Sequence, residues 1–203
     1  SCVWAAEAYG SDAATVLTWI AGQTQHIDVG SAIFQIPGRT PANTAMTAAT
    51  LDTLSAGRFR LGLGVSGPQV SEGWHGVRFN KPLQRTREYV DVVRLALSRT
   101  RVQYDGEFFT LPLPDGPGKA LTLTVHPVRE NIPIYLASIG PKNLELTGEI
   151  ADGWLAIFFS PERAGKLMKP RGAGGGISGR AMDGFEVVPE VWGVQGDDVE
   201  AWA

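Results

Sequence analysis

Apolar and polar residues follow one another in a way that predicts a strand, a helix and a second strand between residues 27 and 64. The first strand is an apolar, β-rich run that ends at the Pro-Gly pair of residues 37–38. A helix then begins, with Thr40 as N-cap and Pro41 as its first residue. A strand with regular alternation follows at residues 59–65. Together these elements predict a βαβ unit.

The same succession of elements continues along the chain and predicts an α/β fold with parallel strands. The expected elements are a strand at residues 1–6, an amphipathic helix at 83–97, a strand at 132–137, a helix at 142–151, a strand at 154–159, a strand at 185–194 interrupted by Pro189, and the start of a helix at 196–203. Glycines at positions 62 and 64 share one face of the strand at 59–65, which indicates that something flat or bulky approaches the backbone there.

Two segments depart from this pattern. Residues 101–128 are predicted to form an excursion with two short antiparallel strands, because YDGE is typical of a hairpin turn and LPLPDGPGK is too rich in proline and glycine for a helix. Residues 166–184 contain RGAGGGISGR and are predicted to be a glycine-rich loop or linker. These glycines do not follow a strand and open a helix, so they form no phosphate-binding fingerprint. Residues 1–203 are therefore expected to form a single domain.

Composition narrows the classes of function. The chain has 203 residues, of which 43% are hydrophobic, enough for a buried core. A formal charge of −3 gives no reason to expect nucleic acid or an anionic membrane as a partner. Neither a run of 18 apolar residues nor a signal peptide is present, so a cytoplasmic location is expected. Cys2 is the only cysteine, and His26, His75 and His126 are scattered, so no internal disulfide forms and no metal site is expected.

In α/β folds with parallel strands, functional residues lie where the strands run out into the following helices. Few residues at these places are titratable, which suits the binding of a redox cofactor better than hydrolysis by side chains. The turn at residues 137–143 lies between a buried strand and a helix, so its amides and Lys142 are suited to a phosphate group. The alternative is that Gly140 and Pro141 merely begin the helix.

The stretch RTPANTAMTAATLDTLSAGRFRLGLGVSG resembles the bacterial luciferase-like superfamily of flavin and deazaflavin oxidoreductases. The resemblance extends from Val3 to Pro161 and is closest to members that use coenzyme F420, among which methylenetetrahydromethanopterin reductase-like enzymes are nearest. It implies a TIM (β/α)8 barrel, a fold that typically needs about 250 residues. The chain would then hold about six of the eight strands and be incomplete at both ends.

The resemblance also implies which residues hold the cofactor. Its deazaflavin-dependent members carry a cis peptide at the place of Ala32 and Ile33, where a bulge backs the cofactor ring. Residues 65–69 would form the other wall, unless they are an ordinary strand-to-loop turn, and the SxGPKN turn resembles a cofactor-contacting turn of the family. The implied cofactor-binding residues are Ala32, Ile33, Val65, Ser66, Gly67, Gln69, Ser138, Gly140, Lys142 and Asn143.

Glu7 is the candidate catalytic residue. The family often places an acidic residue at this strand end, sometimes followed by histidine, but here Ala8 follows. Glu7, together with Tyr9, would then be left to handle a proton. The alternative is that the Glu7 carboxylate accepts hydrogen bonds from loop amides.

Five other residues attract attention but are predicted to be structural. Asp52, Arg58 and Asp152 lie at junctions where such residues usually tie loops on the stable rim of a barrel. His75 is most simply an exposed loop residue, although it could line a substrate entrance, and Cys2 is most simply a small apolar residue in a strand.

The function implied by the resemblance is hydride transfer between coenzyme F420 and a small organic substrate. One alternative is an FMN-dependent luciferase-like monooxygenase. Another is a truncated, non-catalytic relative that binds flavin or dimerises, because a barrel without its first and last strands exposes two sheet edges. The start in a strand and the end in a helix favour a partial record of an active enzyme over such a remnant. A homodimer is expected, since family members commonly pair through helices like the one at 41–54.

Overall fold

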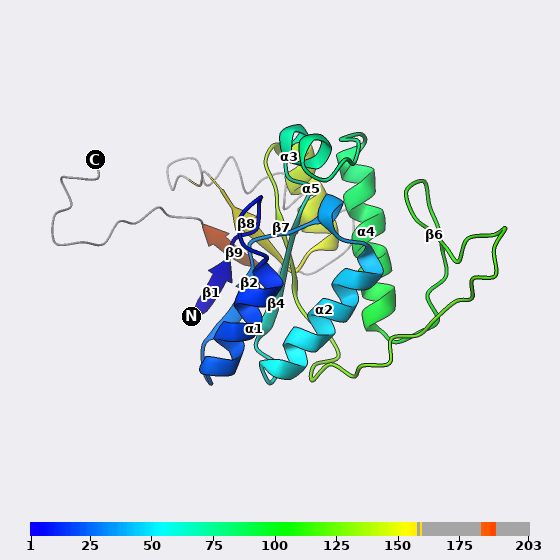
Figure 1. Ribbon diagram of the computed structural model, residues 1–203. Coiled ribbons are helices and arrows are strands. Elements are labelled where there is room, and N and C mark those ends of the chain that lie inside the picture. The colour runs from blue at the N-terminus through cyan, green and yellow to red at the C-terminus, as the bar shows by residue number, and fades with distance from the viewer. Residues whose placement is uncertain (158, 160–183, 190–203) are drawn as a thin grey trace.

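The computed structural model describes residues 1–157, 159 and 184–189. Its centre is a curled seven-stranded sheet in which all pairs are parallel, with the order β1-β2-β4-β7-β8-β9 and with β3 beside β4 (Figure 1). The strands are β1 (Cys2–Ala5), β2 (Asp28–Ser31), β3 (Phe34–Gln35), β4 (Phe59–Gly64), β7 (Ile134–Ala137), β8 (Gly153–Ala156) and β9 (Glu186–Pro189). The predicted α/β fold with a parallel sheet is confirmed.

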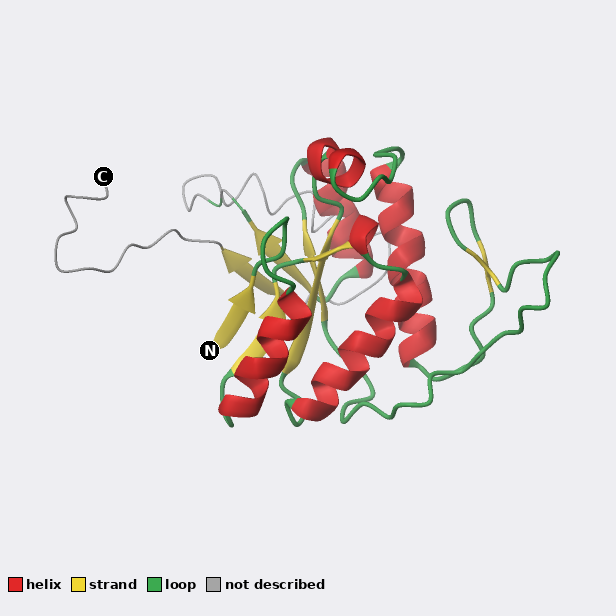
Figure 2. Ribbon diagram, in the orientation of Figure 1, coloured by secondary structure: helices red, strands yellow, loops and turns green. Residues whose placement is uncertain are grey.

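Helices cover the outside of this sheet (Figure 2). They are α1 (Ala13–Gln23), α2 (Pro41–Leu54), the short α3 (Pro68–Gly73), α4 (Pro82–Leu97) and α5 (Pro141–Ile150), with a 3-10 turn, η1, at Ile36–Gly38. Along the sheet, α1 packs against α2, α2 against α4, and α4 against α5. This succession is the outer helical layer that the wrapping of a parallel sheet requires.

The predicted βαβ unit is present, with one difference. Helix α2 begins as predicted, because the Thr40 hydroxyl accepts a hydrogen bond from the Asn43 amide at 3.2 Å and Pro41 occupies the first turn. The first strand, however, is divided into β2 and β3, and the Ala32–Ile33 peptide between them is cis. The cis geometry that the family resemblance implied at this peptide is therefore present.

The backbone approach predicted at Gly62 and Gly64 is made by atoms of the protein itself. A Cβ atom on Gly62 would lie 1.8 Å from the carbonyl oxygen of Ser31. On Gly64 it would lie 2.3 Å from Cδ1 of Ile33. These glycines therefore let the neighbouring strand and the segment around the cis peptide lie close to β4.

The charged residues predicted to be structural are confirmed as such. Asp52 is fully buried and accepts hydrogen bonds from the side chain and amide of Arg129. Arg58 donates to four backbone carbonyl oxygens. Asp152 accepts hydrogen bonds from Arg94 at 3.0 Å and from the first amide of β7 at 2.9 Å. These contacts tie together loops that precede strands, on the rim that contributes to stability.

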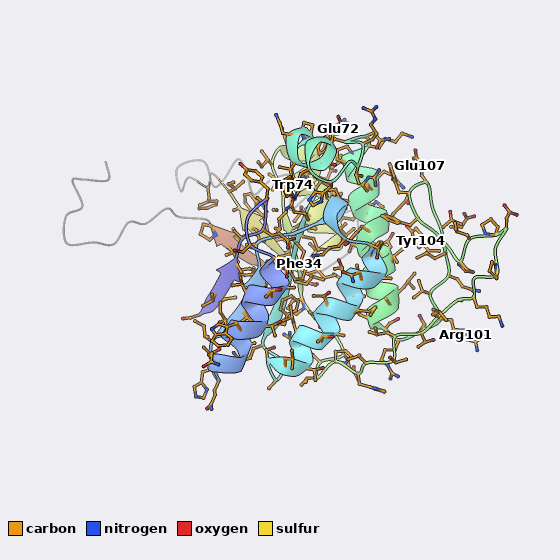
Figure 3. The ribbon with its side chains drawn as sticks, in the orientation of Figure 1. Phe34, Glu72, Trp74, Arg101, Tyr104 and Glu107 are labelled. Carbon is orange, nitrogen blue, oxygen red and sulfur yellow. The ribbon has the colours of Figure 1, made fainter. Side chains whose placement is uncertain are left out.

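The excursion after α4 carries the two predicted short antiparallel strands, β5 (Tyr104–Asp105) and β6 (Thr110–Leu111). The buried Glu88 of α4 holds this hairpin, since its carboxylate accepts hydrogen bonds from the amides of residues 107–109 at 2.7–3.2 Å. Burial acts to raise the pKa of Glu88, but the hydrogen bonds from Gln84 and from these amides hold it below its usual value. Figure 3 shows Tyr104 and Glu107 on the side of the excursion that faces α4.

Some predictions fall largely outside the described residues. These are the glycine-rich loop at 166–184, of which Gly184 alone is described, and the helix at 196–203. Strand β9 confirms the part of the predicted strand at 185–194 that ends at Pro189. Within residues 1–157, 159 and 184–189, no helix combines the length and apolar character needed to cross a membrane.

Candidate active site

A cavity of about 1140 Å³ lies at the carboxyl ends of the parallel strands. The segments that follow β1, β2, β4, β7 and β8 line it, together with the end of β9 and the N-terminal part of α4. In barrels of this type, catalytic and binding residues come from this end of the strands, because the loops there share one rim. The cavity is therefore the candidate active site.

Seven of the ten residues predicted to bind the cofactor line this cavity. They are Ala32, Ile33, Val65, Ser66, Gly140, Lys142 and Asn143. Gly67 is the N-cap of α3 and Gln69 lies in the first turn of that helix, and neither lines the cavity. Ser138 is turned into the protein, where its hydroxyl is hydrogen-bonded to Thr147. Cofactor binding by each of these residues stays a prediction.

The turn at residues 137–143 combines both roles considered for it. Gly140, with φ at 85°, is the N-cap of α5, and Pro141 is the first helical residue. Residues of the same turn face the cavity. The amides of the first helical turn and the Lys142 ammonium group thus give this part of the cavity a positive potential, which favours an anionic group.

The rest of the lining is largely apolar. Apart from Lys142, the described lining residues include no titratable side chain, and their hydroxyl groups come from Ser66 and Thr86. The Thr86 hydroxyl already donates to the Pro82 carbonyl at 2.8 Å. Trp4 and Phe79 also line the cavity and were not predicted, because an apolar side chain in one strand or loop carries no local sign that it will face a cavity.

Glu7 does not line the cavity. Its carboxylate accepts hydrogen bonds from the amides of Ala13 at 3.2 Å and Gln35 at 3.3 Å, and it pairs with Arg39 at 2.9 Å. The structure thus contains the loop-amide contacts that were the alternative interpretation of Glu7. Its catalytic role stays a prediction, and the Tyr9 side chain beside it is exposed.

His75 and Cys2 do not line the cavity either. His75, predicted to be an exposed loop residue, is instead half-buried, because its ring packs against the backbone of Gly38. Burial raises the pKa of the half-buried Cys2 to about 11, which keeps the thiol protonated and unreactive. The described residues bring together no group of three histidine, cysteine or acidic side chains suited to a metal ion.

Comparison with known proteins agrees with this geometry. The chain matches the model of the luciferase-like monooxygenase family over residues 1–203 and belongs to that family. It is 54% identical over 168 residues to Rv3520c of Mycobacterium tuberculosis, a protein assigned as a coenzyme F420-dependent oxidoreductase, with 80% of this chain and 48% of that protein covered. It is 32% identical over 177 residues to a 5,10-methylenetetrahydromethanopterin reductase of Archaeoglobus fulgidus, with 86% of this chain and 49% of that enzyme covered.

Solved structures show the same architecture. The coenzyme F420-dependent tetrahydromethanopterin reductase of Methanopyrus kandleri superposes with a TM-score of 0.80 at 27% identity, covering 92% of this chain and 56% of that one. An F420-dependent secondary alcohol dehydrogenase has the same fold, with a TM-score of 0.82 at 20% identity over 93% of this chain and 59% of that one. The chain spans about half the length of the curated relatives it matches. The described sheet is therefore part of a luciferase-like TIM barrel, as predicted.

Proposed function

We propose that this chain binds coenzyme F420 in the cavity at the strand ends and takes part in hydride transfer between that cofactor and a small organic substrate. The observation that carries the proposal is the cavity itself, which combines a largely apolar lining with a positive end formed by Lys142 and the start of α5. The 54% identity to a protein assigned as an F420-dependent oxidoreductase supports the choice of cofactor.

The cavity fits a cofactor of this kind. Ligand pockets usually have volumes of roughly 300–1,000 Å³, so about 1140 Å³ is enough for a tricyclic ring and part of its side chain. Ala32, Ile33 and Val65 would hold the flat ring between apolar walls. Lys142 and the first amides of α5 would hold an anionic group of the cofactor tail.

When bound, coenzyme F420 supplies the chemistry of hydride transfer at its deazaflavin ring. The residues of the chain orient the ring, keep water away from it and hold the substrate carbon within reach. Since no carboxylate or imidazole is among the described lining residues, catalysis in this half of the barrel depends mainly on orientation.

A direct test is a binding titration of the full chain with coenzyme F420 and, in parallel, with FMN, following cofactor fluorescence. We expect micromolar binding of coenzyme F420 and much weaker binding of FMN. The reverse preference would replace the proposal with an FMN-dependent monooxygenase. Binding of neither cofactor would contradict catalysis by this chain and leave either a non-catalytic relative or a barrel too incomplete to bind the cofactor.

Lys142→Ala is expected to weaken binding of coenzyme F420 by about two- to fivefold at low salt, because one cation near an anionic group contributes roughly 0.3–1 kcal/mol. The measurement is the same titration at two salt concentrations, and the difference from wild type should shrink as salt screens the charge. Lys119→Ala, which removes an exposed lysine from the excursion, is the matched control. Equal losses in both variants would show that the effect is not local to the cavity.

The proposal includes a homodimer formed through α2. Met46 and Leu54 of this helix are large apolar side chains with 55% and 53% exposure, and they would supply apolar surface for such a contact.

A further inference from the structure

Gln35 connects two loops that follow different strands at the cavity. It is buried, with 1% exposure, and lies at the end of β3. Its side-chain nitrogen donates to the carbonyl oxygen of Ala8 at 2.6 Å, in the segment after β1. Its side-chain oxygen accepts a hydrogen bond from the Ser66 hydroxyl at 2.8 Å, in the segment after β4. Of these residues Ser66 lines the cavity, so Gln35 holds the hydroxyl of a lining residue without lining the cavity itself.

Donors and acceptors in these hydrogen bonds can be assigned in one way. The carbonyl of Ala8 can only accept, so the part of the Gln35 amide that faces it must be the NH2 group. The amide oxygen of Gln35 then faces Ser66, and because this oxygen carries no hydrogen, the Ser66 hydroxyl must donate. The Gln35 backbone is held as well, since its amide donates to the Glu7 carboxylate at 3.3 Å.

This arrangement has a consequence for what Ser66 can recognise. A hydroxyl has one hydrogen and two lone pairs, and here the hydrogen is committed to Gln35. The geometry points to Ser66 as an acceptor for the ring N–H that lies between the two carbonyl groups of the cofactor's pyrimidinedione, with Gln35 as the positioning residue that acts through it. The inference rests on the proposed function, because it concerns the ring bound in the same cavity.

Ser66 has φ at 57°, in the left-handed region that favours glycine. A glycine at this position therefore fits the local backbone, so Ser66→Gly removes the hydroxyl without straining the turn.

The test compares two probes on the full chain: the free chromophore of coenzyme F420, an 8-hydroxy-5-deazaflavin with a ribityl side chain, and its N3-methyl derivative. The methyl group removes the N–H donor and leaves the carbonyl groups in place. We expect the wild type to bind the methylated probe at least about three- to tenfold more weakly, because it loses one hydrogen bond and must also accommodate the methyl group. Dissociation constants come from chromophore fluorescence.

Three variants assign this preference to the two residues. Ser66→Gly suits the local φ, and we expect it to bind the unmethylated probe about three- to tenfold more weakly than wild type and to bind both probes equally. Gln35→Met frees the hydroxyl hydrogen, so the preference should shrink. The double variant should be no worse than Ser66→Gly, because Gln35 acts through Ser66.

Ser71→Ala is the matched control, since Ser71 is a buried serine whose hydroxyl donates to the Val77 carbonyl at 2.7 Å and which does not line the cavity. It should keep the wild-type preference, and thermal unfolding of every variant checks the fold. If Ser66→Gly kept the wild-type preference, or if the losses added in the double variant, the inference would be overturned while the proposed function would stand. If the wild type bound neither coenzyme F420 nor the probes, the proposed function would fail first.

Discussion

Gly62→Ala is expected to prevent the chain from reaching its native fold, or to lower the free energy of unfolding by at least about 3 kcal/mol. The added Cβ atom would lie 1.8 Å from the Ser31 carbonyl oxygen and 2.8 Å from Cδ1 of Leu155. The first of these is a backbone atom of β2, so relief requires β2 to move away from β4. That movement would also break the two hydrogen bonds, each 2.9 Å long, between the Ser31 hydroxyl and the Gly62 backbone. Denaturant unfolding and the yield of soluble protein measure the effect.

Gly22→Ala in α1 is the control. A Cβ atom there would meet nothing within 4 Å, so the variant is expected to gain about 0.5–1 kcal/mol from the helix propensity of alanine. A Gly62→Ala protein as stable as wild type would show that β2 and β4 are not packed as closely as described. The pair of variants therefore separates a general effect of replacing glycine from the steric effect of one position.

The elements that could be predicted from the sequence are those whose ends are set by residues a few positions away. Helix α2 began where Thr40 and Pro41 placed it, because a cap and a first-turn proline act on amides a few residues away. Helix α4 followed from its apolar spacing. Helix α1 was not identified, although Asp12 caps it by accepting a hydrogen bond from the Thr15 amide at 2.8 Å.

Features that depend on distant contacts could not be predicted from residue types. The division of the first strand into β2 and β3 depends on how that segment packs against β4. The short α3 has no side-chain cap, since Gly67 precedes it, so no local signal marks its start. Trp4 belongs to the cavity because the curl of the sheet carries β1 there.

The candidate site was predicted better than the contacts within it. Seven of the ten residues chosen lie at the cavity because loops at the carboxyl ends of parallel strands must meet at one rim. The direction of a side chain within such a loop is decided elsewhere. Ser138 turns toward Thr147 in the following helix, and Glu7 is held by Arg39 from the segment before α2. In a barrel, the position of the site can therefore be predicted from the sequence, whereas the roles of individual residues depend on packing.

Arg129→Leu is expected to lower the free energy of unfolding by about 3–5 kcal/mol, because it leaves the carboxylate of Asp52 buried without a counter-ion. Asp52 has 0% exposure and accepts hydrogen bonds from Arg129 at its backbone amide (3.0 Å), Nε (2.9 Å) and Nη2 (2.5 Å). Arg129 also donates to the carbonyl of Phe59, so it fastens the end of the excursion to α2 and β4 together. The measurement is denaturant unfolding at neutral pH.

Arg101→Leu is the matched control, since Arg101 is an exposed arginine near the other end of the same excursion (Figure 3) and its loss should change stability by less than about 0.5 kcal/mol. Combining Asp52→Leu with Arg129→Leu should recover part of the loss, because the stranded charge is then removed along with its partner. Equal stability of Arg129→Leu and Arg101→Leu would mean that the Asp52–Arg129 ion pair does not hold the excursion. Arg129 lies a few residues before β7, and the opposite end of β7 leads into residues that line the cavity. The stability of the rim that holds Asp52 and Arg129 and the geometry of the candidate site are therefore linked through one strand.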